Sequence, residues 1–375
     1  MSLIELKGMT WDHLRGLDSL VASNELLVSR TAVSVTWDAR SLLVFGDQHV
    51  EDFYREYDLL VIDHPHVPDA VAAGAILAFE DYANEAVLEE LSRTSVGASH
   101  DSCLYRGKHW ALAIDTAAQV SAFRPDISEG APIFWSDAFD LGRKNDLLWP
   151  YKPVDAFSTF ATLMAQKGNP LAGGDSYFDL EVASEVLEFM VELADLVPDW
   201  CSESNPIDIA EILATTNDYG NAVAMYGYSN YSRSGFRKNV IHYEDVPSFD
   251  GKASGSQLGG AGIAVSAASR DPDAAMKAAQ FLALPEVPAS TYGLKSGQPG
   301  NLVAWKSPRL NEEVHNFFSN TLRTLERAWV RPRVLGWPDV QYETSQVIHK
   351  MLTDRKVRAK NIVLMNSFYE RYVQE

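Results

Sequence analysis

The N-terminal third of the chain alternates short apolar runs with stretches whose apolar residues recur at helical spacing. Residues 4–9 predict a short strand, residues 32–37 are rich in strand-forming residues, residues 59–62 are a continuous apolar run, and residues 17–27 have the helical spacing. The run at 59–62 is apolar at every position, which is typical of a strand buried on both faces of a parallel sheet. The order strand, helix, strand, helix, strand predicts an open α/β sheet.

The middle of the chain predicts a hairpin and an amphipathic helix. Residues 101–115 favour a hairpin that turns at residues 106–108, with a second strand that ends at Asp115. Residues 179–197 have apolar positions on one helical stripe. The stripe consists of Ala183, Val186, Leu187, Met190, Leu193 and Ala194.

Further along, residues 221–233 predict a strand that opens into a tyrosine-rich loop, and residues 255–269 predict a glycine-rich return strand. A helix follows, for which Asp271 is the expected N-cap, Pro272 the first residue and Pro285 the stop. Two long helices are predicted near the C-terminus, at residues 309–329 and 340–373.

Size and charge narrow the class of protein. A chain of 375 residues exceeds what one hydrophobic core usually organises, so two lobes are expected. The formal net charge of −19 would repel nucleic-acid backbones and anionic lipid surfaces, so we expect no nucleic-acid partner. No apolar run is long enough for a transmembrane helix, so direct membrane insertion is not expected.

The two cysteines, Cys103 and Cys201, match no metal or redox spacing. We interpret both as buried small hydrophobes, although a disulfide between them stays open. The N-terminus shows neither the charged nor the apolar region of a secretory signal. This favours either a cytoplasmic protein or one from which a signal has been removed.

Three polar motifs each follow a predicted strand. They are TWDH at residues 10–13, WDAR at 37–40 and DHPH at 63–66. Because open α/β sheets bind ligands beyond the carboxyl ends of their strands, we expect the three motifs to converge on one rim.

The DHPH motif has three interpretations. Asp63, His64 and His66 are good metal ligands, but no third or fourth ligand cluster is visible, so no metal is predicted. A satisfied polar loop is the second interpretation, and direct ligand contact by Asp63 or His64 is the third. In each case Pro65 fixes the loop that carries these side chains.

The order of elements resembles the extracellular solute-binding proteins of ABC importers, specifically the large sugar-binding class related to maltodextrin-binding protein. The segment from residue 37 to 63 is similar to that family's second strand, helix and third strand. LYRGKHWALAIDTAAQVSAFRPD (104–126) is similar to its crossover passage, with Phe123 where the family tends to have tyrosine. LGGAGIAVSAASRDPDAAMKAAQFL (258–282) resembles its return crossover and helix, and GQPG (297–300) the loop after it.

The resemblance implies a two-lobed periplasmic-binding-protein-like α/β fold (type II) with discontinuous lobes and a hinge. The N-terminal lobe would comprise residues 1–115 and 255–308, and the C-terminal lobe residues 116–254 and 309–375. It implies a monomer that carries no cofactor and binds a small carbohydrate or sugar-like solute reversibly in the interlobe cleft. The partner would be the membrane permease of an ABC importer, and the location periplasmic or extracellular, with cytoplasmic as the alternative.

Several side chains are candidates for contact with this solute. Trp11 beside Asp12 and His13 would offer an apolar face next to hydrogen-bonding groups, as a sugar ring requires, although Trp11 also suits a core. Arg40 would bind an anionic group or, the reading we favour, pair with a local acid. The remaining candidates are Asp63, His64, Asp115, Trp135, Tyr177, Tyr226, Tyr228, Tyr231 and Gly260.

A catalytic role is the weaker alternative. Carboxylate pairs are common in an acidic protein, so they indicate nothing about glycoside hydrolysis. The GYSNY sequence at 227–231 is not Gly-x-Ser-x-Gly, and LGGAG at 258–262 lacks the spacing and lysine of a phosphate-binding loop. We therefore expect a binding protein with no catalytic residues, and an enzyme or cytoplasmic sensor on the same fold is the alternative.

Overall fold

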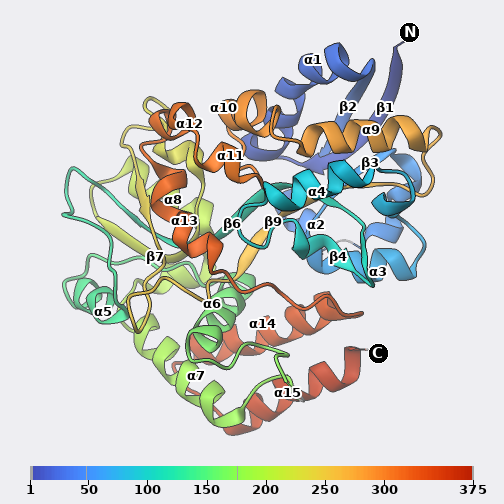
Figure 1. Cartoon of the computed structure of the whole chain (residues 1–375). Helices are drawn as coiled ribbons and strands as arrows, with labels where there is room; N and C mark the ends of the chain where they lie inside the picture. The colour runs from blue at the N-terminus through green and yellow to red at the C-terminus, as the bar shows by residue number, and fades with distance from the viewer. Residues whose placement is uncertain (1–2, 48, 175, 374–375) are drawn as a thin grey trace. The chain divides into compact units, whose positions relative to one another are not determined.

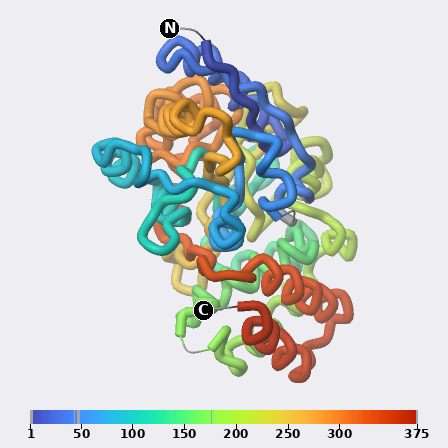
Figure 2. Tube along the Cα trace, turned by 90° about the vertical axis from the view of Figure 1, so that its right-hand side faces the viewer, coloured from blue at the N-terminus to red at the C-terminus, as the bar shows by residue number. Residues whose placement is uncertain are grey.

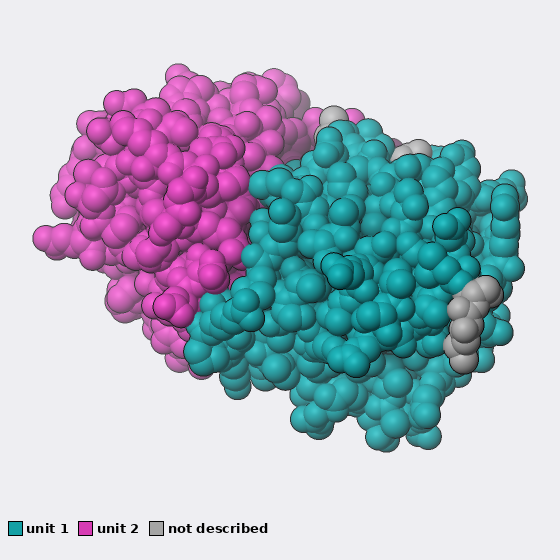
Figure 3. Space-filling view, turned by 90° about the horizontal axis from the view of Figure 1, so that it is seen from above, with its two compact units in different colours: residues 1–116, 259–311, 333–335 teal, residues 117–258, 312–332, 336–375 magenta. Residues whose placement is uncertain are grey.

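The computed structural model describes residues 3–47, 49–174 and 176–373 (Figure 1). The chain forms two compact units, and each is assembled from separate stretches of sequence (Figure 3). The first unit comprises residues 1–116, 259–311 and 333–335, and the second comprises residues 117–258, 312–332 and 336–375.

The first unit is built on a mixed sheet. Strand β1 (Ile4–Trp11) pairs in parallel with β2 (Val33–Arg40) and β3 (Leu59–Ile62). Strand β3 then pairs antiparallel with β9 (Leu258–Val265), which neighbours β6 (Leu112–Phe123). The predicted open α/β sheet is confirmed, with β9 as an antiparallel member. The helices of this unit are α1 (Ser19–Thr31), α2 (Leu42–Asp47), α3 (Val67–Ala72), α4 (Glu85–Arg93), α9 (Pro272–Ala283), α10 (Gly293–Lys295), α11 (Leu302–Trp305) and most of α12 (Pro308–Glu313).

Strand β3 is apolar at every position because both faces of this sheet are covered. Leu59 and Val61 belong to a core that includes residues of α1 and α9. Leu60 and Ile62 point to the opposite face and belong to a second core with Val67 of α3. Successive side chains of a strand alternate between faces, so two cores require a continuous apolar run.

Helix α9 begins as its sequence predicts. Asp271 is the N-cap, and its Oδ1 accepts a hydrogen bond from the backbone N–H of Ala274 at 3.0 Å. Pro272 is the first helical residue, where a missing N–H costs nothing. The helix ends at Ala283, before Pro285.

In the second unit, β7 (Asn221–Tyr226) and β8 (His242–Glu244) both pair antiparallel with β6. The six residues predicted for the apolar stripe of α7 (Leu180–Ala194) are all buried, which confirms that stripe. Helices α14 (Trp337–Thr353) and α15 (Ala359–Tyr372) contact each other and run side by side in both views (Figures 1 and 2). The helices are α5 (Trp135–Arg143), α6 (Pro153–Gln166), α7 (Leu180–Ala194), α8 (Pro206–Thr215), α13 (Phe317–Glu326), α14 (Trp337–Thr353) and α15 (Ala359–Tyr372).

The predicted end of a strand at Asp115 is wrong. A short hairpin does turn at Arg106 and Gly107, between β4 (Leu104–Tyr105) and β5 (Lys108–His109). Strand β6 is a separate element that continues beyond Asp115 to Phe123. A carboxylate is tolerated inside this buried strand because it is paired with a buried arginine, as described below.

The two long helices predicted near the C-terminus are each broken in two. His315 and Asn316 adopt the left-handed backbone conformation, with φ of 46° and 64°, and separate α12 from α13. Arg355, with φ of 51°, lies in the turn between α14 and α15. A left-handed residue cannot continue a right-handed helix, so each helix ends there.

Candidate functional site

The three polar motifs of the first unit lie at one edge of its sheet. The parallel register places Trp11 opposite Arg40, and Met9 opposite Leu60, so β1, β2 and β3 end together. Antiparallel pairing places Gly262 opposite Ile62, which brings the start of β9 to the same edge. The expectation that these strand ends share one rim is confirmed.

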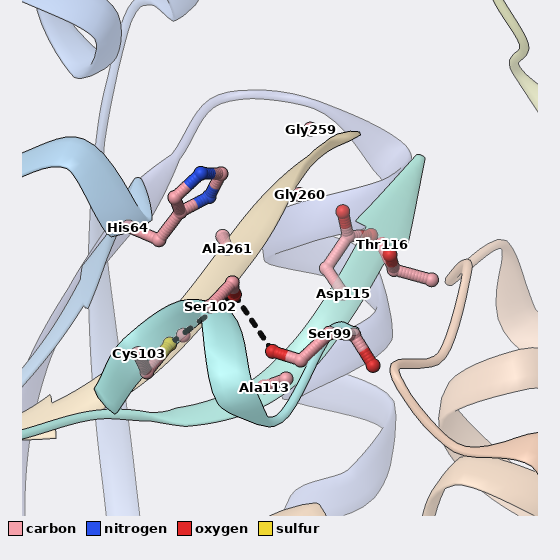
Figure 4. Close-up of a pocket in the computed structure, with 11 residues that line it drawn as sticks. His64, Ser99, Ser102, Cys103, Ala113, Asp115, Thr116, Gly259, Gly260 and Ala261 are labelled. Carbon is pink, nitrogen blue, oxygen red and sulfur yellow. Dashed lines mark hydrogen bonds between the residues drawn. The ribbon is translucent and has the colours of Figure 1, made fainter. Parts of the chain in front are cut away.

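A narrow pocket, too tight to hold a water molecule in this structure, lies at this rim (Figure 4). Four segments line it: His64 after β3, residues within the stretch 99–103, the first half of β6 and the first half of β9. Two predicted residues besides His64, Asp115 and Gly260, are therefore brought together here. Ser99, Ser102, Cys103 and Thr116 also line the pocket, and sequence reasoning did not identify them as site residues.

Arg15 forms a buried ion pair with Asp115, which is one of the residues that line the pocket. The Arg15 Nε donates to Asp115 Oδ2 at 2.7 Å, and its Nη2 donates to Oδ1 and, at 3.3 Å, to the Thr116 carbonyl. Arg15 is 5% exposed and Asp115 is 3% exposed. Burial raises the pKa of Asp115, and the guanidinium opposes that change. The pair occupies both carboxylate oxygens, so Asp115 fixes the geometry of β6 at the pocket.

The TWDH motif divides between core and surface. Trp11 is 4% exposed and packs against Phe45, with 5.2 Å between ring centroids. Asp12 is exposed. His13 is partly buried, and its Nδ1 accepts from the backbone N–H of Arg15 at 3.1 Å. Burial, with the neighbouring guanidinium, lowers the pKa of His13 to about 4, so its imidazole is neutral at pH 7.

Arg40, Asp63 and His64 are held by contacts within the first unit. The Arg40 guanidinium lies 4.0 Å from the ring centroid of Phe53, and burial lowers its pKa to about 10. His64 Nδ1 lies 3.3 Å from Asp63 Oδ1, and His64 is buried while Asp63 is partly exposed. The proline-containing turn that follows Asp63 is a short helical turn of three residues, His64–His66.

Gly260 permits a close approach of β9 to β6. Its φ of +123° is a conformation that side-chain-bearing residues rarely adopt. A Cβ atom there would overlap the Asp115 carbonyl oxygen and lie 2.6 Å from the Thr116 Cα. The absence of a side chain at Gly260 therefore lets the two backbones approach closely at the pocket.

The candidates in the second unit have internal partners. The Tyr231 hydroxyl donates to Glu211 at 2.7 Å, the Trp135 Nε1 donates to Gln166 at 2.8 Å, and the Tyr177 ring stacks on Tyr369. Tyr226 is partly exposed, and its hydroxyl accepts from Gln257 at 2.9 Å, while Tyr228 is 7% exposed. Ligand contact by these five residues stays a prediction.

Three further observations concern metal binding, the cysteines and membrane spans. Within the described part of the chain, no group of three or more His, Cys, Asp or Glu side chains could hold a metal ion. Cys103 and Cys201 are buried free cysteines, which confirms the reading of both as small buried residues. Among residues 3–47, 49–174 and 176–373, no helix is both long and apolar enough to cross a membrane.

The fold is that of the two-lobed, periplasmic-binding-protein-like class, which confirms the predicted fold class. No protein-family model matches the chain, and no curated protein sequence matches it. The similarity of this chain to known proteins is therefore a similarity of structure.

Three solved structures show this likeness over almost the whole chain. Maltose-bound MalE3 of T. maritima has a TM-score of 0.80 and 17% identity, and the match covers 98% of this chain and 99% of that one. An ABC transporter solute-binding protein from Agrobacterium radiobacter K84, in complex with ribitol, has a TM-score of 0.83 and 15% identity, covering 99% and 100%. One from Thermotoga lettingae TMO, bound with alpha-D-tagatose, has a TM-score of 0.78 and 16% identity, covering 98% and 99%.

Proposed function

We propose that this chain is the substrate-binding component of an ABC importer and reversibly binds a small carbohydrate or sugar-like solute. The observation that carries the proposal is the match of nearly the full chain to solute-binding proteins whose bound ligands are maltose, ribitol and tagatose. Its partner would be the membrane permease of the importer. It would act as a monomer, in the periplasm or outside the cell.

The proposed site lies at the strand-end rim of the first unit. Asp12 and Asp63 provide acceptors there, His64 and the backbone of β9 lie beside them, and the Arg15–Asp115 pair fixes the floor. Sugar hydroxyls require several such donors and acceptors in fixed positions. Charge-assisted hydrogen bonds to a carboxylate are roughly twice as strong as neutral ones, so Asp63 would contribute strongly to affinity.

The proposal includes no chemical step. Burial raises the pKa of the Cys103 thiol to about 12, so the one thiol in this pocket stays protonated and is a poor nucleophile. The structural neighbours named above are binding proteins as well.

The direct test incubates the protein with a panel of neutral sugars, polyols and sugar acids. We measure the melting temperature with each compound and identify the compound by mass spectrometry afterwards. A ligand that binds only the folded state raises the melting temperature, and by mass action an excess of about 100 times Kd adds roughly 2.7 kcal/mol of stability. Recovery of the solute unchanged is expected, whereas turnover would replace this proposal with an enzyme.

Once a solute is found, Asp63→Asn tests the site. We expect the affinity to fall about tenfold, because the amide keeps the shape of the carboxylate and loses its charge. Glu89→Gln is the matched control, since Glu89 is exposed on α4 of the same unit. Calorimetric titration of both variants against the wild type measures the difference, and equal affinities for all three would place the solute elsewhere.

A further inference from the structure

The second unit carries a groove that solute binding does not explain. It has a volume of about 220 Å³ that water can reach, and it lies between α7 and the segment around residue 249. We refer to it as the acidic–aromatic groove, defined by Lys167, Glu185, Glu188, Phe189, Glu192 and Phe249.

Its wall is aromatic and accessible. The rings of Phe189 and Phe249 meet edge to face, with 5.4 Å between centroids, and Trp135 supports Phe189 from behind at 5.6 Å. Phe249 is 40% exposed. Ile133 and Phe134 nearby are 61% and 43% exposed, and Phe134 forms a bridge with Ser248, so the apolar surface extends beyond the groove. Exposed apolar surface of this kind, bordered by charge, is typical of a docking site.

Its rim is acidic. Glu185, Glu188 and Glu192 are spaced by three and four residues on α7, so they share one face of the helix, and all three are exposed. Lys167 pairs with Glu185 at 3.4 Å. Among the residues that the structure describes, Glu188 and Glu192 have no ion-pair partner, so this rim has uncompensated negative charge.

The groove already accommodates one cation beside its aromatic wall. The Lys167 ammonium lies 5.0 Å from the ring centroid of Phe249. A cation over an aromatic face is attracted by the ring electrons, and Glu185 adds direct charge pairing. A second cation, supplied by another molecule, would meet an aromatic ring at Phe189 and carboxylates at Glu188 and Glu192.

We propose that the acidic–aromatic groove docks a basic amphipathic segment of a partner protein. The apolar side chains of that segment would cover Phe249 and Phe189, and its lysines or arginines would pair with Glu188 and Glu192. Charge complementarity selects this occupant over a second copy of the chain or an anionic lipid surface, because both of those carry net negative charge.

The test uses a fluorescein-labelled amphipathic peptide of leucine and lysine and the full-length protein. Fluorescence anisotropy gives the affinity for wild type and for Glu188→Lys/Glu192→Lys. Glu25→Lys/Glu89→Lys is the control, because it changes net charge equally at exposed positions of α1 and α4. We expect the groove variant to weaken binding about tenfold or more and the control to leave it within about twofold.

Three results would overturn the proposal. If both charge variants weakened peptide binding equally, the peptide would be attracted to the acidic protein as a whole and not to the groove. Undiminished binding by Phe249→Ala would exclude the aromatic wall, and wild-type dimerisation that Phe249→Ala abolishes, in ultracentrifugation, would assign the groove to a second copy. The groove residues lie outside the proposed solute site, so we expect solute affinity to be unchanged in these variants.

Discussion

At the scale of single residues, the Arg15–Asp115 pair makes the sharpest prediction. Asp115→Leu leaves a guanidinium buried without its carboxylate, and loss of one partner from a buried pair costs about 3–5 kcal/mol. Arg15→Met together with Asp115→Leu removes both charges, so we expect the double variant to recover most of that loss. Urea unfolding of the two single variants and the double variant measures the coupling.

An exposed pair serves as the control for this cycle. Arg143 and Asp140 are joined at 2.7 Å, but their side chains are 62% and 66% exposed. Asp140→Leu should therefore change the free energy of unfolding by less than about 1 kcal/mol. If the two single variants of Arg15 and Asp115 lost stability by amounts that add up to the loss in the double variant, the role we assign to the buried pair would be contradicted.

Asp155 predicts a pH dependence. It is 4% exposed, one of its oxygens has no hydrogen-bond partner among the described residues, and burial raises its pKa to about 8. A raised carboxyl pKa means that the folded state binds the proton more tightly than the unfolded state. The stability associated with this group is therefore complete below pH 4 and is lost as the pH rises toward 8.

Asp155→Asn removes the loss of stability that accompanies ionisation of this carboxyl group. We expect the variant to be more stable than wild type by on the order of 2 kcal/mol at pH 8, and the difference to vanish near pH 4. Guanidinium unfolding at several pH values gives both curves. A difference that is constant with pH would show that the amide acts by packing and not by proton linkage.

Residue-scale prediction from sequence succeeded where the signal is local. The capping by Asp271 and Pro272 involves neighbours in the chain, and the structure shows it as predicted. Arg15 was missed because its partner is 100 residues away and nothing in its own neighbourhood marks it as buried. The stacking of Tyr177 on Tyr369 of α15 is another long-range contact that neighbouring residues in the sequence do not reveal.

At the scale of elements, periodicity located the helices but not their breaks. The helical spacing of Val314, Phe317, Phe318, Leu322 and Leu325 predicts one apolar stripe. Four of these five residues are buried and Leu322 is partly buried. The break at His315 and Asn316 lies inside that stripe and contains neither glycine nor proline. Tertiary packing overrides local preference there, and sequence alone does not report it.

The C-terminus of α1 offers a test of the same backbone effect. Ala32 is the C-cap residue, with φ of 58° and its N–H donating to the Val28 carbonyl. This conformation costs alanine roughly 1–2 kcal/mol and glycine almost nothing. We expect Ala32→Gly to stabilise the protein by about 1 kcal/mol. Ala22→Gly, within the same helix, should destabilise it by about the same amount in parallel urea titrations.

At the scale of the whole molecule, the excess of acidic residues opposes compaction. The formal net charge is −19 at pH 7, and the sequence pI is about 4.9. Exposed ion pairs such as Lys252–Asp250, at 2.9 Å, act over short distances and contribute about 0–1 kcal/mol each. Repulsion between unpaired acids acts over the whole surface and is the larger effect at low ionic strength.

Salt should therefore stabilise this protein at neutral pH. Raising the ionic strength from about 0.01 M to 0.15 M shortens the screening length from about 30 Å to 8 Å, which removes most long-range repulsion. We expect the free energy of unfolding at pH 7 to rise by about 1 kcal/mol, and the same salt step near pH 5, close to the pI, to have little effect. A fall in stability with salt at pH 7 would mean that paired charges outweigh the net repulsion, and equal effects at both pH values would indicate ion binding in place of screening.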